Sequence, residues 1–174
     1  VDARHARAAY NLGLAYLHRG DFASAWGLTE SRFDTLPPVA LRPKLSLPPF
    51  TARDLGGGHR IAIWKEQGVG DQILYATLLP ELEARGQDFV AEVDRRLVPA
   101  FVRAHPAWKV TAPEDSAAPF AQCNRHIPFG SLPGLLRPSL ESFASQPQRL
   151  LAADPARVER DRMDLWRPAG GDEG

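Results

Sequence analysis

Short apolar runs alternate with segments of helical spacing from residue 60 onward, and this alternation constrains the fold more than any other feature. The runs that predict strands are "RIAIW" (60–64), "DFVAEV" (88–93), "WKVT" (108–111) and "HIPF" (126–129). The segments that predict helices between them are "DQILYATLLPELEARG" (71–86), ended by Gly86, and "RRLVPAFVRAHP" (95–106), which starts or breaks near Pro99. Strands and helices at this spacing predict βαβ units, a parallel sheet and therefore an α/β fold.

A helical hairpin is expected ahead of this unit, over residues 6–36, with Gly20 and Asp21 at the turn. Its pattern resembles one tetratricopeptide (TPR) repeat at Leu12, Gly13, Tyr16, Gly20, Phe22, Ala25 and Pro37. The pattern departs from that repeat at Ala9, Thr29 and Arg32, where a tryptophan, an apolar residue or a small residue would stand. Because about three repeats are needed for a solenoid, we expect this hairpin to end a truncated array or to dock on the next domain.

Residues 37–59 are rich in proline and contain three consecutive glycines, which predicts an extended connector lying on the surface of the next domain. A polyproline ligand for a recognition domain is the alternative, and the connector is favoured. Asp154-Pro155 predicts the cap and first turn of a last helix that reaches Trp166. The expected organisation is a hairpin at 1–36, a connector at 37–59, an α/β domain at 60–166 and a flexible tail at 167–174.

The composition excludes several classes of function. The chain has 21 basic and 21 acidic side chains, so its net charge is zero and nucleic acid is not expected as a partner. The scattered histidines and the lone Cys123 predict no metal site, and a single cysteine suits a reducing, cytoplasmic compartment. No apolar run approaches the ~20 residues of a membrane helix. Since the chain does not begin with Met and ends in "PAGGDEG", we expect both ends to be cut from a longer protein.

The loop "EQGVGD" (66–71) lies where a strand gives way to a helix, the usual place for ligands in α/β proteins. Gly68 and Gly70 predict a tight turn, and the carboxylate of Asp71 is expected to cap the helix start or to act in chemistry. The loop has no third glycine for a dinucleotide fingerprint, and Lys65 precedes the glycines, unlike the lysine of a phosphate loop. No cofactor is therefore expected.

The region from "RIAIWKEQGVGDQILYATLLPEL" onward resembles the first domain of TPR-linked glycosyltransferases related to the bacterial heptosyltransferases. The matching residues are Glu66, Gln67, Gly68, Gly70, Asp71, Gln72, Ile73 and Pro80. The resemblance implies one Rossmann-like half of a two-domain GT-B enzyme. This half would hold the acceptor, and an absent second half would hold most of the nucleotide sugar.

By resemblance, Asp71 matches the heptosyltransferase general base, which takes a proton from an acceptor hydroxyl. Glu66, Gln67 and Gln72 are possible acceptor contacts, shaped by the turn at Gly68 and Gly70. His126 and Ser131 lie in a segment expected near the same sheet edge, where Ser131 bonds an acceptor or caps a short helix.

The resemblance leaves two functions open. The first is sugar transfer by a longer protein, with this chain inactive alone. The second is a non-catalytic scaffold that contacts a protein partner, or itself, through residues 6–36.

Overall fold

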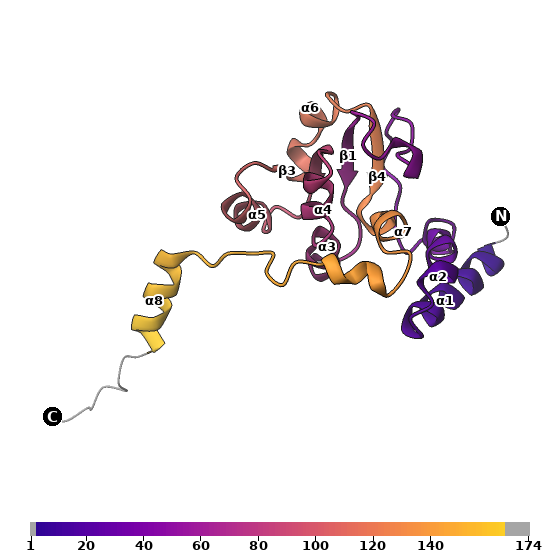
Figure 1. Ribbon diagram of the computed structural model, residues 1–174, viewed down its shortest axis with the longest axis horizontal. Coiled ribbons are helices and arrows are strands. Elements are labelled where there is room, and N and C mark those ends of the chain that lie inside the picture. The colour runs from indigo at the N-terminus through magenta and orange to yellow at the C-terminus, as the bar shows by residue number, and fades with distance from the viewer. Residues whose placement is uncertain (1–2, 166–174) are drawn as a thin grey trace.

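Four parallel strands form the sheet at the centre of the molecule, whose computed structural model describes residues 3–165 (Figure 1). The strands are β1 (Arg60–Trp64), β2 (Asp88–Glu92), β3 (Lys109–Thr111) and β4 (Arg125–Pro128). Their order across the sheet is β3-β2-β1-β4, and each neighbouring pair is parallel. The predicted α/β class with a parallel sheet is therefore confirmed.

The two faces of the sheet are covered by different segments. One face packs on α3 (Val69–Ala76), α4 (Leu79–Ala84), α5 (Val98–Ala104) and α7 (Leu132–Leu136). Ile61 and Ile63 point to this face, which carries the larger apolar core. Ala62 and Trp64 point the other way, towards α6 (Ala117–Phe120), because side chains alternate along a strand. The connection from β3 to β4 runs back across the sheet on this second face, as right-handed crossovers require.

The long helix expected at 71–86 is broken into α3 and α4. Pro80 lies in the first turn of α4, and a proline there has no N–H to donate to the carbonyl one turn earlier. A continuous helix through this point would lose that hydrogen bond, so α3 ends at Ala76 and α4 starts at Leu79. The expected start near Pro99 is met by α5, which begins at Val98.

Two helices precede the sheet domain in the chain and pack against each other: α1 (Ala3–His18) and α2 (Phe22–Thr29). Gly20 makes the turn with φ of +76°, and Asp21 caps α2 by accepting a hydrogen bond from Ser24 N at 3.1 Å. The second helix tightens into a 3₁₀ turn, η1 (Glu30–Phe33), so it is shorter than the sequence pattern suggests. The predicted pair of helices is present, and its assignment to the TPR type stays a prediction.

The segment before β1 lies along the sheet domain. Leu45 and Leu47 pack on the second face of the sheet, and a short 3₁₀ turn, η2 (Ala52–Asp54), precedes β1. The connector also pairs with the free edge of β4, where Phe50 N donates to His126 O at 2.7 Å. This pairing covers backbone groups that an exposed edge would leave unpaired.

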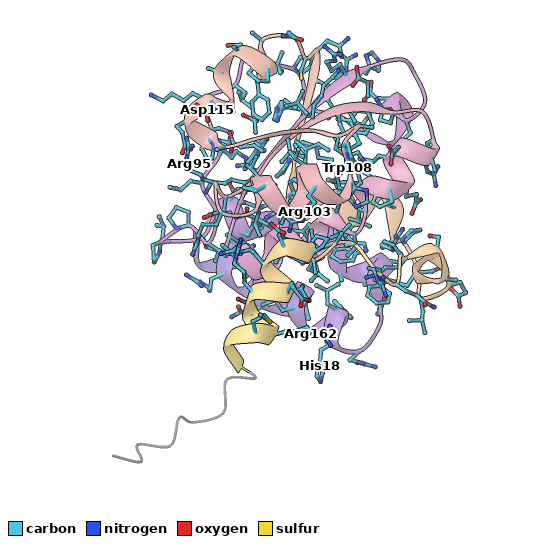
Figure 2. All side chains as sticks on the ribbon, turned by 90° about the vertical axis from the view of Figure 1, so that its left-hand side faces the viewer. His18, Arg95, Arg103, Trp108, Asp115 and Arg162 are labelled. Carbon is cyan, nitrogen blue, oxygen red and sulfur yellow. The ribbon has the colours of Figure 1, made fainter. Side chains whose placement is uncertain are left out.

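The last part of the chain leaves the sheet domain. Within that domain, the short turn η3 (Pro113–Asp115) follows β3 and η4 (Phe129–Ser131) follows β4. After α7, the turn η5 (Glu141–Ser145) leads into an extended stretch and α8 (Pro155–Leu165). Arg103, labelled in Figure 2, donates from Nε and Nη2 to Ala152 O, both at 3.1 Å. Beyond this contact α8 stands away from the body (Figure 1). The expected end of this helix at Trp166 and the tail at 167–174 lie outside the described residues. Within residues 3–165, no helix is both long and apolar enough to cross a bilayer.

Candidate functional site

The carboxyl ends of β1 and β4 meet where the strand order reverses, the position at which open α/β sheets bind ligands. The loop that leaves β1 carries Glu66, and the turn η4 follows β4 directly. Gly130 N in η4 donates to Glu66 Oε1 at 2.7 Å, so the two strand ends are tied together. The sequence-predicted loop therefore lies at the expected edge of the sheet.

An arginine from the hairpin fills the space beside this junction. Arg32 Nε lies 2.7 Å from Glu66 Oε2, and Arg32 Nη2 lies 2.9 Å from Glu66 Oε1. Both side chains are almost fully buried, with exposures of 3% and 1%. Burial opposes the charge of Arg32, but hydrogen bonds to Glu66 and the charges of Glu66 and Glu30 raise its pKa above the ordinary value. Glu66, predicted as an acceptor contact, thus has both oxygens engaged inside the protein.

The arginine also reaches Ser131 and Glu30, which extends the network towards solvent. Arg32 Nη2 donates to Ser131 Oγ at 2.8 Å, and Arg32 Nη1 donates to Glu30 Oε1 at 2.8 Å. Ser131 Oγ donates to Glu30 Oε1 at 2.6 Å. The Glu30 side chain is 46% exposed, so this end of the network is open.

Gly130 is required where the two strand ends touch. A Cβ at this position would lie 2.7 Å from Glu66 Oε1 and 3.3 Å from the Tyr75 ring. The backbone of η4 can therefore approach the buried ion pair only because residue 130 lacks a side chain.

Asp71 lies in the first turn of α3 and is half-buried. Its Oδ2 accepts a hydrogen bond from Gly68 N at 2.9 Å, the helix-capping arrangement. Among the described residues, Oδ1 accepts no hydrogen bond. One oxygen of the predicted base thus caps the helix and the other is unengaged within this part of the chain.

The tight turn of the loop falls on Gln67, which differs from the expectation that the glycines make it. Gln67 has φ of 59°, whereas Gly68 has extended backbone with φ of −79° and Gly70 is already helical. A non-glycine residue in this left-handed region is uncommon and costs free energy. Tyr75 Oη donates to Gln67 Oε1 at 3.4 Å and holds the side chain in place.

Gln72, predicted as an acceptor contact, is buried and spans two loops. Its Nε2 donates to Gln67 O at 3.3 Å, and its Oε1 accepts from Asp94 N at 2.7 Å. The structure therefore brings the predicted site residues to one edge of the sheet, with Glu66 and Gln72 serving the loop framework.

A hollow of about 330 Å³ opens between the hairpin, the connector and the end of β4. Its lining residues are Trp26, Gly27, Glu30, Pro49, Phe50, His126, Ile127, Pro128, Ser131, Gly134 and Leu135. The indole N–H of Trp64 donates to His126 Nδ1 at 3.0 Å, and burial lowers the pKa of His126. The ring is therefore neutral near pH 7 and carries its proton on Nε2.

A smaller hollow of about 90 Å³ lies beyond Trp26 and is walled by Leu74, Phe143 and Arg137. Trp26 Nε1 donates to Arg137 O at 2.6 Å, which fastens the hairpin to α7 at a second point. Within the described residues, Nε and Nη2 of the buried Arg137 have no hydrogen-bond partner.

The contribution of Arg32 to this junction does not follow from the local sequence pattern, although one signal pointed to it. Arg32 is a charged residue at a helical position where the repeat pattern has a packing residue, and such a substitution suggests a buried partner. In the described part of the chain, no group of three or more His, Cys, Asp or Glu side chains is placed to hold a metal ion.

Comparison with known proteins yields one similarity that covers nearly the whole chain. No family model matches, and no solved structure matches. The chain is 34% identical over 183 aligned positions to Protein FlbA of Caulobacter vibrioides. The alignment covers 95% of this chain and 29% of FlbA, so the chain spans less than a third of that relative.

Proposed function

We propose that this chain is the acceptor-binding half of a glycosyltransferase that moves a sugar from a nucleotide sugar to an acceptor hydroxyl. The observation that carries the proposal is the position of the Asp71 carboxylate, at the start of a helix beside the carboxyl end of a parallel sheet. The strand order β3-β2-β1-β4 matches the first four strands of the Rossmann order 3-2-1-4-5-6, in keeping with a GT-B acceptor domain.

Asp71 is the general base in this proposal. Its Oδ2 is held by Gly68 N, which orients the carboxylate, and its Oδ1 accepts the proton as the acceptor oxygen attacks the anomeric carbon. Gln67 directly precedes Gly68, whose N–H the base accepts, and contacts the acceptor in this proposal. The buried Glu66 and Gln72 hold the loop and do not touch the substrate.

The nucleotide sugar binds to a second domain of the full-length protein. FlbA is more than three times as long as the stretch aligned here, so a protein of that length has room for such a domain. The buried, unpaired Cys123 suits a reducing cytoplasm as the compartment.

The test compares two aspartates that cap helices. In the full-length protein, Asp71→Asn should lower the rate of sugar transfer by about 10²–10⁴, the usual worth of a general base. Asp21→Asn changes a carboxylate that caps α2 in a similar way and should leave the rate unaltered. The assay supplies a panel of nucleotide sugars and follows release of the nucleotide. Equal rates of sugar transfer in the two variants would show that Asp71 is not the general base.

A scaffold is the second candidate, and the buried Arg32 favours it. Arg32 fills the junction of β1 and β4, where a ligand would otherwise lie, and uses both oxygens of Glu66. The hairpin also exposes Leu12 and Leu14 at 48% and 43%, which suits contact with another protein or a second copy. Sedimentation across micromolar concentrations tests self-association, and Leu14→Glu should abolish it. A full-length protein that associates through the hairpin and turns over no nucleotide sugar would support the scaffold.

A further inference from the structure

The hollow between the hairpin and the sheet domain has the size and lining of a small-molecule site. Its volume of about 330 Å³ is within the range of roughly 300–1,000 Å³ that such sites occupy. Its walls come from α2, the connector, β4 and α7, so it exists only when the hairpin is docked. Asp71 is not among its lining residues, so it is distinct from the proposed catalytic loop.

Three of its lining residues have unused hydrogen-bonding capacity within the described chain. Glu30 Oε1 accepts from Arg32 and Ser131, which leaves Oε2 without a partner. Ser131 Oγ donates to Glu30 and accepts from Arg32, and its second lone pair remains.

His126 supplies a donor. Its Nδ1 is occupied by the Trp64 indole, so the proton is on Nε2, which donates to no other described residue. The lining of the hollow therefore offers two acceptors and one donor, from three different elements.

The charges at the hollow select against anions. Glu30 and Glu66 carry two negative charges, and Arg32 carries one positive charge that both carboxylates already share. The network is thus net negative, so no cation is left for a phosphate or a carboxylate. A cationic ligand such as an ammonium would find Glu30 but has no lone pair to accept the N–H of His126. A neutral ligand whose groups both donate and accept fits all three residues.

The remaining walls are apolar. Trp26 and Phe50 line the hollow together with Pro49 and Leu135. A sugar ring matches this combination, because it carries hydroxyls along its edge and C–H groups on its faces. Pockets of this kind use a few placed polar groups for orientation and aromatic side chains for contact.

We propose that this hollow binds a neutral saccharide, with hydroxyls donating to Glu30 Oε2 and Ser131 Oγ and accepting from His126 Nε2. The site requires the docked hairpin, so the hairpin is part of a carbohydrate-binding surface. The proposal does not depend on sugar transfer, because the 174-residue chain should bind without a nucleotide sugar.

The test uses saturation-transfer NMR on the 174-residue chain with the methyl α-glycosides of glucose, galactose and mannose as probes. At least one should show saturation transfer and a saturable titration. Gly27→Leu should abolish the signal, because Gly27 lines the hollow and a Cβ there meets no atom within 4 Å, so the added side chain enters free space. Glu30→Ala should weaken binding by about tenfold or more, the usual loss for a hydrogen bond to a charged group.

Two matched variants complete the test. Ala23→Leu places the same leucine side chain on an exposed position of α2 outside the hollow and should retain binding within about twofold. Asp71→Asn should also retain it, which separates this site from the proposed base. The proposal is overturned if no glycoside shows transfer, if Gly27→Leu still binds, or if choline binds in place of the sugars. Circular dichroism confirms that each variant is folded.

Discussion

Arg32 and Glu66 lie 34 positions apart in the sequence and form a bidentate, buried ion pair that joins the hairpin to the sheet domain. Glu66 Oε1 also accepts from Gly130 N, so one carboxylate connects the hairpin, the end of β1 and the turn after β4. The geometry of the candidate site depends on this pair, because it fixes where the hairpin docks.

Breaking the pair on one side should be strongly destabilising. Arg32→Met leaves Glu66 as a buried, uncompensated carboxylate, so the free energy of unfolding should fall by about 3–5 kcal/mol. The double variant Arg32→Met with Glu66→Met should lose less than the sum of the two single losses. Urea denaturation measures all three. Arg42→Met removes an exposed ion pair with Asp34 and a cation–π contact on the Phe33 ring, and should lower stability by no more than about 1 kcal/mol. Additive losses in the cycle would show that the pair is not coupled.

The same substitution at two hairpin glycines should have opposite effects. A Cβ at Gly13 would lie 3.0 Å from Thr29 Cγ2, so Gly13→Ala forces the helices apart and should lower stability by about 1 kcal/mol. A Cβ at Gly27 meets nothing within 4 Å, so Gly27→Ala should raise stability by about 0.5–1 kcal/mol through helix propensity. Thermal denaturation of the two variants gives the sign of each stability change. A stabilised Gly13→Ala variant would contradict the close helix contact.

The protein should be more stable with glycine at position 67 than with alanine there. Its φ of 59° costs any residue with a Cβ about 1–2 kcal/mol, and glycine avoids that cost. Both variants lose the hydrogen bond from Tyr75 Oη, so their difference isolates the backbone. In chemical denaturation, we expect the free energy of unfolding of Gln67→Gly to exceed that of Gln67→Ala by about 1 kcal/mol. Equal stabilities would mean that the loop relaxes out of the left-handed conformation.

The carboxylate of Asp54 should titrate well below its usual range. Hydrogen bonds from the hydroxyl and the backbone N–H of Thr51, with help from Arg125, lower the pKa of Asp54 to about 2. Since the folded pKa is below the unfolded one, the stabilisation is complete above about pH 4 and is lost as the pH falls through about 2.

Thr51→Val removes the hydroxyl donor and should raise the pKa of Asp54 towards its ordinary value, as read from carboxyl ¹³C shifts. Acid unfolding should then depend less steeply on pH between about 4 and 2. Thr77→Val removes a hydroxyl that, among residues 3–165, bonds Leu74 O alone, and should leave the Asp54 midpoint in place. An unmoved midpoint in Thr51→Val would rule out Thr51 as the cause.

The strands and the two-helix hairpin could be predicted from local patterns, because apolar periodicity and turn residues act over a few positions. "RIAIW" is β1 at the predicted bounds, and the other three strands differ from theirs by one or two residues. The break at Pro80 was not anticipated, since the apolar spacing continues across it although the hydrogen bonding does not. The turn was expected at the glycines, but Gln67 adopts the left-handed conformation.

The sequence alone determined the class of fold, the order of its parts and the loop that opens α3, since each depends on neighbouring residues. Only the tertiary structure decided that Arg32 enters the junction of β1 and β4, that Glu66 and Gln72 are framework residues, and that a hollow opens beside Glu30 and His126. The physical reason is that a buried charge must find its partner in space, and the chain pattern around Arg32 does not specify a carboxylate 34 positions away.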